Sequence, residues 1–257
     1  MEFSLDEGRY DLLISNVSYE RDNGQFECRV KAPGSGVDLH AQAVRLTVLM
    51  QPEPPKIVQG PKPTATEGKP FTLTCSSAGG SPDPQIQWYR VGGSQPLDAV
   101  LRPGSGREPS TATLTLNATR ADDGAVFRCQ VWNRALPGNT KLEAVVTLNV
   151  NYYPRVDVGP DNPIKVERDA SARLQCNVDA KPRVTNVRWT RNNVFISNQM
   201  THTLQRVTIH DAGLYVCSAE NGLGQVGQAE LKLDVLHPPQ VTIRPIFSNT
   251  FLSLHQV

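Results

Sequence analysis

One seven-residue pattern occurs three times in the chain and constrains its fold more than any other feature. The clearest copy runs from Asp211 to Cys217, and the other two run from Asp22 to Cys28 and from Asp123 to Cys129. In each copy an acid lies six residues before a cysteine, and an aromatic residue lies two before it. On a strand the aromatic and the cysteine share a face, and the acid falls in the preceding turn. Recurrence in register indicates a repeated domain.

Two of the copies complete a larger pattern that is typical of immunoglobulin domains. A first cysteine is followed, at the same interval in both sets, by a tryptophan and then by the cysteine of the motif. In such domains the cysteines join facing sheets and the tryptophan packs against the bridge. We predict an all-β chain of tandem immunoglobulin-like β-sandwiches of the I-set or C2 type, with Greek-key connections. The two sets are Cys75, Trp88 and Cys129, and Cys176, Trp189 and Cys217, with disulfides Cys75–Cys129 and Cys176–Cys217.

The fifth cysteine, Cys28, has no predicted partner in this chain. We expect strand E over 10–17, strand F, which contains Cys28, over 25–31, and strand G over 43–49. The strands of the first half of a domain are missing before them. A buried or reactive free thiol is the alternative. We favour a disulfide partner outside this chain, because the motif places Cys28 as it places the other two. We therefore expect the chain to be a piece of a larger product.

The spacing of the motifs predicts four segments. Residues 1–50 are the C-terminal half of a domain, 51–150 and 151–236 are complete domains, and 237–257 begin a further one. Proline-containing stretches at 51–56 and 151–155 are the expected linkers. The stretch 92–110 is rich in glycine and proline, so we expect a long loop or short edge strands there.

Cysteine and sequon placement predict an extracellular location. Disulfides persist in oxidising compartments, and the sequons at Asn16 and Asn117 lie the same distance before Cys28 and Cys129. We predict N-glycosylation at both asparagines. No apolar run of about 18 residues could span a bilayer, and the first 30 residues hold no secretory apolar core. Membrane attachment is expected only through a segment outside this chain.

No constellation of residues indicates catalysis, so we predict no enzyme activity, no catalytic residues, no cofactor and no metal site. The three corner acids could suggest Ca²⁺, but single acids more often cap turns or pair with arginine. The arginines at 183, 188 and 191 could meet acidic glycans, although a solvated strand surface is the favoured interpretation. A net charge of +1 gives no general attraction to nucleic acid, and we expect no small-molecule substrate. The five histidines are scattered, at His40, His202, His210, His237 and His255.

Binding is the function that remains. Gln25, Glu27 and Arg29 have the parity opposite to Phe26 and Cys28, so they should face outward on the sheet that contains strands C, F and G. We predict them as a candidate partner-binding face. The alternative is an ordinary solvated sheet surface.

Four stretches resemble the ectodomains of insect Echinoid-type adhesion molecules, including Friend-of-echinoid, with the nephrin-like group next. They are Gly8–Leu12 leading to Cys28, Asn151–Val156, Asn186–Trp189 and Asn221–Gly224. The resemblance implies a single-pass membrane protein at cell–cell junctions. Such proteins bind like or related immunoglobulin-domain proteins on neighbouring cells and adjust receptor signalling.

Three alternatives remain beside an adhesion ectodomain. The chain could be the outer part of a receptor kinase or phosphatase, or a secreted or truncated decoy isoform. A cytosolic array of the muscle type is disfavoured, because such arrays rarely carry disulfides.

Overall fold

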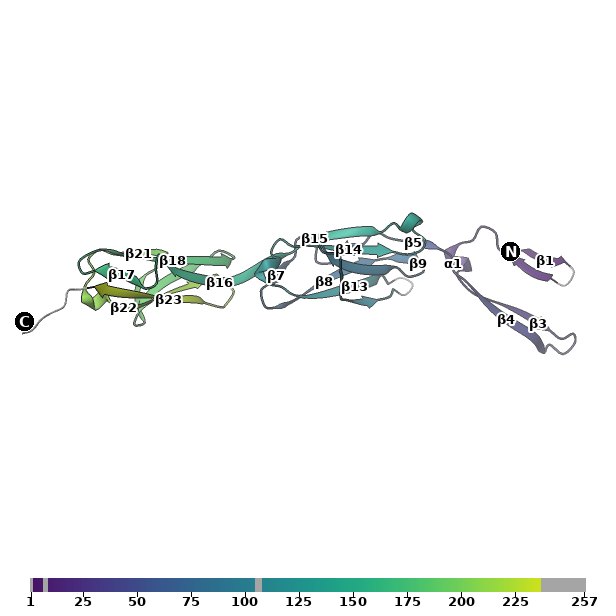
Figure 1. Ribbon diagram of the computed structural model, residues 1–257. Coiled ribbons are helices and arrows are strands. Elements are labelled where there is room, and N and C mark those ends of the chain that lie inside the picture. Colours follow the sequence, from purple (N-terminus) through teal and green to yellow (C-terminus); the bar gives the residue numbers. More distant parts are fainter. Residues whose placement is uncertain (1, 7–8, 105–107, 237–257) are drawn as a thin grey trace, which may run out of the picture. The chain divides into compact units, whose positions relative to one another are not determined.

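The computed structural model describes residues 2–6, 9–104 and 108–236 (Figure 1). Contacts divide the chain into two compact units, Met1–Tyr152 and Tyr153–Val257. Strands dominate both units, which confirms the predicted all-β class. None of the described helices is long and apolar enough to cross a bilayer. The predicted start of a further domain at 237–257 lies outside the described residues, as do His237 and His255.

The first 50 residues form two hairpins joined by a short helix. Strand β1 (Glu2–Asp6) pairs antiparallel with β2 (Arg9–Leu13), and α1 (Tyr19–Asp22) follows. Strand β3 (Gly24–Lys31) then pairs with β4 (Asp38–Leu46). Strand β2 is shorter than the strand predicted over 10–17, because Asn16 adopts the left-handed conformation, with φ of 50°.

Residues 50–150 form a sandwich of two four-stranded sheets. Strands β11 (Pro96–Leu97) and β12 (Ala99–Arg102) lie in the 92–110 stretch, so the predicted short edge strands are present there. Strand β5 (Met50–Pro52) pairs with β9 (Gly79–Ser81), and β7 (Thr64–Thr66) runs parallel to the start of β16 (Asn149–Gly159). One sheet has the order β11 (Pro96–Leu97), β10 (Gln85–Arg90), β14 (Val126–Trp132), β15 (Leu142–Thr147). The other has the order β12 (Ala99–Arg102), β13 (Ser110–Asn117), β8 (Pro70–Ser77), β6 (Lys56–Ile57).

A disulfide and a tryptophan occupy the centre of this sandwich. Cys75 on β8 bonds to Cys129 on β14, with 6.4 Å between their Cα atoms. Trp88 is fully buried beside them, and its indole Nε1–H donates to the carbonyl oxygen of Ala112 at 3.0 Å. Burial alternates along β8 and β14, as the period-two pattern requires. The first predicted disulfide is confirmed.

The second unit is also a sandwich. Cys176 on β18 (Ala172–Lys181) bonds to Cys217 on β22 (Gly213–Glu220), which confirms the second predicted disulfide. Trp189 is fully buried in the core. One sheet has the order β21 (Thr201–Leu204), β18 (Ala172–Lys181), β16. The other has the order β17 (Ile164–Glu167), β23 (Gly227–Leu236), β22 (Gly213–Glu220), β19 (Asn186–Arg191), β20 (Val194–Ser197).

The structure differs from the prediction at both proline-containing stretches. Residues 151–155 lie inside β16, and half of 51–56 belongs to strands, with Gln51 and Pro52 in β5 and Lys56 in β6. Proline removes a backbone donor but fixes a φ that an extended edge strand accepts. Pro52 and Pro154 therefore lie within strands, where the composition suggested irregular linkers, whereas Pro54 and Pro55 lie between β5 and β6.

Candidate functional site

Three acidic side chains hold the corners that precede the motif cysteines. The carboxylates of Asp22 and Asp211 accept hydrogen bonds from the backbone amides of Ser18 and Thr208, both at 2.8 Å. In the domain between them, however, the carboxylate that accepts from the Thr119 amide at 2.9 Å belongs to Asp122. The capping acid there is thus seven residues before the cysteine, not six.

The predicted corner acid Asp123 has a different role. Its carboxylate accepts a hydrogen bond from the Val150 amide at 2.8 Å, which ties the corner to the start of β16. The equivalence that sequence spacing assigned to Asp123 is therefore wrong. In this domain the segment from the capping acid to the motif cysteine is one residue longer than in the other two copies. Counting six residues back from Cys129 therefore reaches Asp123, the residue after the capping acid.

Hydrogen bonds keep these corner carboxylates ionised. The Arg21 side chain and the Ser18 amide lower the pKa of Asp22. The Thr208 amide and hydroxyl lower the pKa of Asp211. Partial burial would raise the pKa of Asp122, but hydrogen bonds from Thr119 and from the Arg90 guanidinium outweigh it, and the pKa is lowered. Each acid therefore stabilises its corner as a carboxylate.

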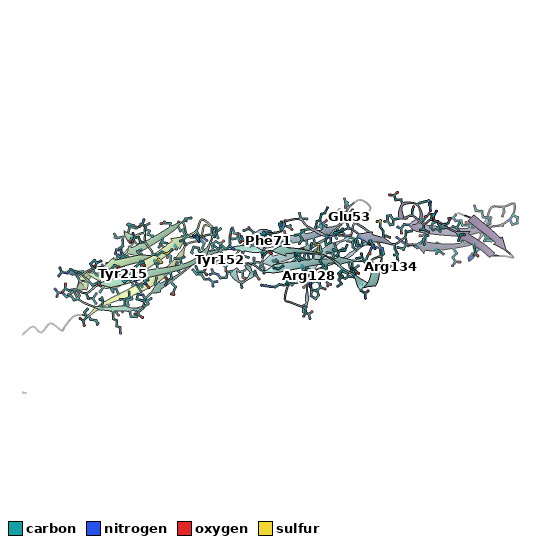
Figure 2. The ribbon with its side chains drawn as sticks, turned by 90° about the horizontal axis from the view of Figure 1, so that it is seen from above. Glu53, Phe71, Arg128, Arg134, Tyr152 and Tyr215 are labelled. Carbon is teal, nitrogen blue, oxygen red and sulfur yellow. A yellow bond between two sulfur atoms is a disulfide. The ribbon has the colours of Figure 1, made fainter. Side chains whose placement is uncertain are left out.

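The corner of the second unit has one further tie. The hydroxyl of Tyr215, a residue labelled in Figure 2, donates to the backbone oxygen of Asp211 at 2.8 Å. This bond is the tyrosine corner of immunoglobulin domains. Burial raises the pKa of the Tyr215 hydroxyl. Phe26 and Phe127 take the same place in the other two copies and have no hydroxyl to donate.

The predicted partner-binding face lies on the outer side of the β3–β4 hairpin. Gln25, Glu27 and Arg29 are all exposed, and the register places them opposite Arg45, Ala43 and Ala41 of β4. The face is defined here as the outer β3–β4 face and consists of these six residues.

Glu27 and Arg29 of the outer β3–β4 face are paired with each other, and Arg29 also lies near Asp38. The Arg29 guanidinium lies 2.6 Å from the carboxylate of Glu27 and 3.7 Å from that of Asp38. The hydrogen bond from Arg29 lowers the pKa of Glu27. Asp38 was missed by sequence reasoning, since only the register of the hairpin brings it to Arg29. Following the alternation of polar residues from β3 into β4 would have indicated Asp38 as a member of this surface.

The inner side of the same hairpin is apolar and open. Phe26 and Cys28 of β3, Val44 of β4, and Leu12 and Ile14 are among the residues that line a hollow of about 780 Å³, to which Glu27 and Arg29 also contribute. The side chain of Val44 is 61% exposed. Cys28 is an exposed free thiol, whereas Cys129 and Cys217, its equivalents, are buried in disulfides. The inner side therefore has the pattern of a sandwich core without a covering sheet in the described part of the chain.

The other candidate residues do not converge into a site. Among the described residues no group of histidine, cysteine and acidic side chains could hold a metal ion. Arg191 donates to the backbone oxygens of His210 and Ala212, so it belongs to the tyrosine corner. Arg188 lies over the ring of Phe195, 5.5 Å from its centroid. The predicted arginine cluster is thus divided between separate roles.

Both predicted glycosylation sites are exposed. Asn117 ends β13, and Asn16 lies in the loop between β2 and α1. The backbone oxygen of Asn16 accepts a hydrogen bond from Arg21 at 2.7 Å, so this bond does not occupy the side-chain amide that would carry a glycan.

These features define tandem disulfide-bonded β-sandwiches, each centred on one tryptophan. A family model described as "Immunoglobulin domain" matches residues 54–133 and 154–221, and the chain belongs to this family. It is 30% identical over 247 residues to human Kin of IRRE-like protein 2, a match that covers 93% of this chain and 33% of the relative. It is 29% identical over 228 residues to human Cell adhesion molecule 4, covering 84% of this chain and 55% of the relative.

A solved structure gives the same answer for the fold. The crystal structure of the full ectodomain of mouse nectin-like molecule 4 (Ig1–Ig3) matches with a TM-score of 0.56 and 26% identity, over 93% of this chain and 83% of that one. The narrower resemblance to Echinoid-type molecules stays a prediction.

Proposed function

We propose that this chain is a recognition module of an extracellular cell-adhesion protein and binds other immunoglobulin-domain proteins. The observation that carries the proposal is the family match across two successive disulfide-bonded sandwiches. The two disulfides indicate a protein of an oxidising compartment, where such bonds persist. Rigid sandwiches present sheet faces and loops to partners. A relative is named as a cell adhesion molecule, which supports the same activity here. The proposed mechanism is binding without catalysis.

The finer parts of the proposal follow the Echinoid-type resemblance. The whole protein would cross the plasma membrane once, through a segment outside this chain, and act at cell–cell junctions. Its partners would be like or related immunoglobulin-domain proteins on neighbouring cells, and binding would adjust signalling. The domains proposed within the chain are 1–50, 51–150 and 151–236, with a further one from 237.

Asn16 and Asn117 are proposed to carry N-linked glycans. When the chain is expressed in secretory cells, enzymatic removal of N-glycans should lower its mass. The loss of mass should be smaller for the Asn16→Gln variant and for the Asn117→Gln variant than for the wild-type chain. An unmodified asparagine in either sequon, found by peptide mass spectrometry, would remove that site from the proposal.

The outer β3–β4 face is the proposed partner-binding surface. Its exposed Glu27 and Arg29 form a charged pair at the centre of the hairpin. Reversing one charge leaves two like charges side by side, which should reduce complementarity to the partner.

Bead aggregation of the full chain tests this surface. Beads coated with the wild-type chain, and beads coated with Glu27→Arg, are mixed with themselves and with beads carrying related immunoglobulin-domain proteins. Clustering or capture should drop severalfold for Glu27→Arg. The control is Glu20→Arg, an exposed reversal on α1 of the same segment, which should behave as wild type. Equal clustering of all three chains would refute the surface, and the absence of any clustering would refute the adhesive function.

A further inference from the structure

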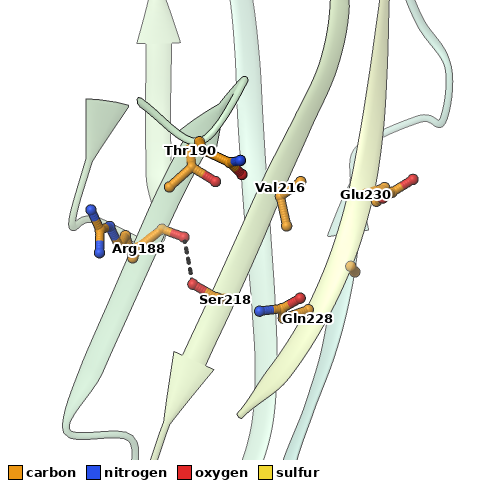
Figure 3. Close-up of a pocket in the computed structure, with 8 residues that line it drawn as sticks. Arg188, Thr190, Val216, Ser218, Gln228 and Glu230 are labelled. Atoms are coloured by element: carbon orange, nitrogen blue, oxygen red, sulfur yellow. Dashed lines mark hydrogen bonds between the residues drawn. The ribbon is translucent and has the colours of Figure 1, made fainter. Parts of the chain in front are cut away.

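A second sheet face carries the features of an interface, on the outer side of β19, β22 and β23. The register aligns two rows of outward side chains across these strands (Figure 3). Both rows alternate with the buried residues Trp189, Tyr215 and Cys217, so their members face away from the core. We define these six residues as the outer β22 face: Arg188, Ser218 and Gln228 in one row, and Thr190, Val216 and Glu230 in the other.

The outer β22 face combines a shallow hollow with exposed apolar groups. Its residues line a depression of about 660 Å³. Leu214, the next outward residue of β22, is 51% exposed, and Phe195 on β20 is 52% exposed. Phe195 holds the Arg188 guanidinium over its ring. Aromatic and arginine side chains of this kind are enriched in protein interfaces.

Two opposite charges stand at diagonal corners of the face without an ion pair among the described residues. Neither Arg188 nor Glu230 forms an ion pair with any described residue, whereas Lys232, farther along β23, lies 3.0 Å from Asp234. The corresponding face of residues 50–150 differs in this respect, since Arg128 lies 3.7 Å from Glu143 within the face. The charges of the outer β22 face are therefore available to a partner.

We propose that the outer β22 face binds the same face of a second copy of this chain. Opposite charges at diagonal corners make the face self-complementary. A two-fold axis that lies in the plane between two such faces, perpendicular to the line from Arg188 to Glu230, brings each arginine opposite the other copy's glutamate. This contact is isologous and closes at a dimer. Val216 and Ser218, at the centre, allow the two sheets to approach.

This interface is separate from the outer β3–β4 face and does not depend on it. It would join copies of the chain to one another, whatever the first hairpin binds. The bead experiment and the experiment below can therefore fail independently. Because the charges lie at the corners of an exposed face, the contact should weaken as ionic strength rises.

Charge exchange in the full chain tests the proposal. Sedimentation equilibrium should show a monomer–dimer equilibrium for the wild type. Arg188→Glu or Glu230→Arg alone puts like charges at both contacts and should raise the dimer dissociation constant about tenfold or more. An equimolar mixture of the two variants restores both opposite pairs, so it should form a mixed dimer with nearly the wild-type constant.

The control is Arg173→Glu, an exposed reversal on β18 of the other sheet, which should leave the constant unchanged. Matching thermal unfolding curves check that the exposed substitutions leave the fold intact. Three results would overturn the proposal: a monomeric wild type up to the millimolar range, single variants that self-associate as the wild type does, or a mixture that fails to recover. Loss with Arg173→Glu as well would also refute it, since the contact would then lie elsewhere.

Discussion

The carboxylate of Asp211 couples protonation to the stability of its domain. The ionised carboxylate accepts hydrogen bonds from the backbone amide and the hydroxyl of Thr208. These bonds lower the pKa of Asp211 below its value in the unfolded chain. A lowered pKa means that the stabilisation is present above the unfolded pKa. It is lost as pH falls through the acidic range to below the folded pKa.

Replacing Asp211 with asparagine should lower the free energy of unfolding by about 1 kcal/mol at neutral pH. The difference from wild type should shrink as the pH falls, because protonation removes the same charge from the wild-type chain. Urea unfolding at neutral pH and at pH of about 3 measures both values. Asp161→Asn, at an exposed position, is the control, and a difference that grows in acid would contradict the expectation.

The Tyr215 hydroxyl should contribute a similar amount. Its hydrogen bond to the backbone oxygen of Asp211 joins strand β22 to the turn that precedes it. Tyr215→Phe should cost about 1 kcal/mol of unfolding free energy without changing the fold, since Phe127 takes this place in the neighbouring domain. Chemical denaturation monitored by tryptophan fluorescence checks it. Unchanged stability would mean that water replaces the bond at no cost.

Among the elements, β23 depends on a missing side chain at its first residue. Gly227 begins this strand, and a Cβ there would overlap the carbonyl group of Pro154 on β16. The close approach explains a glycine at a position without a positive φ. Both residues belong to the second unit, so the contact fixes the start of β23 against its own sandwich.

Gly227→Ala should therefore destabilise the second unit by about 1–3 kcal/mol, the range for overpacking. Thermal unfolding of the full chain gives the measurement. Gly159→Ala is the control, because an added Cβ there meets its nearest atom at 3.8 Å, an ordinary contact. If the two variants had the same unfolding temperature, β23 would be free to shift away from Pro154.

Strands next to the disulfides were predictable from sequence, because alternate burial and the cysteine–tryptophan interval identify them directly. Strand β10 carries the core tryptophan Trp88, and β14 and β22 carry the motif cysteines. Strands that contain proline were less predictable, since β16 continues through Pro154 where composition suggested a break. On the candidate face, the parity of Glu27 was readable, but the pairing of Arg29 with Asp38 depends on a hairpin register that no local pattern fixes.

At the scale of the whole molecule, each complete sandwich has its own core and its own disulfide. The bridges close loops between residues 54 and 41 positions apart in sequence. In the chain-entropy account each contributes about 4 kcal/mol by restricting the unfolded chain.

Replacing Cys75 and Cys129 together by alanine should remove about this amount from the first sandwich alone. Limited proteolysis under native conditions should then cut first within 54–150 and leave 154–236 protected. The paired replacement of Cys176 and Cys217 is the matched counterpart and should reverse the order. Simultaneous cutting of both sandwiches in either variant would show that they unfold as one cooperative unit.

The longer corner of the first sandwich also limits how the repeats can be recombined. In all three copies a glycine follows the capping acid by two residues, as Gly124 follows Asp122, and Ala125 is the additional residue before the strand. A chimera that joined the corner of one domain to the strand of another, with the junction set by counting residues back from the cysteines, would gain or lose one residue. That shift reverses the parity of the strand and turns its cysteine toward solvent. Grafts between these domains should be aligned on the hydrogen-bonded acid.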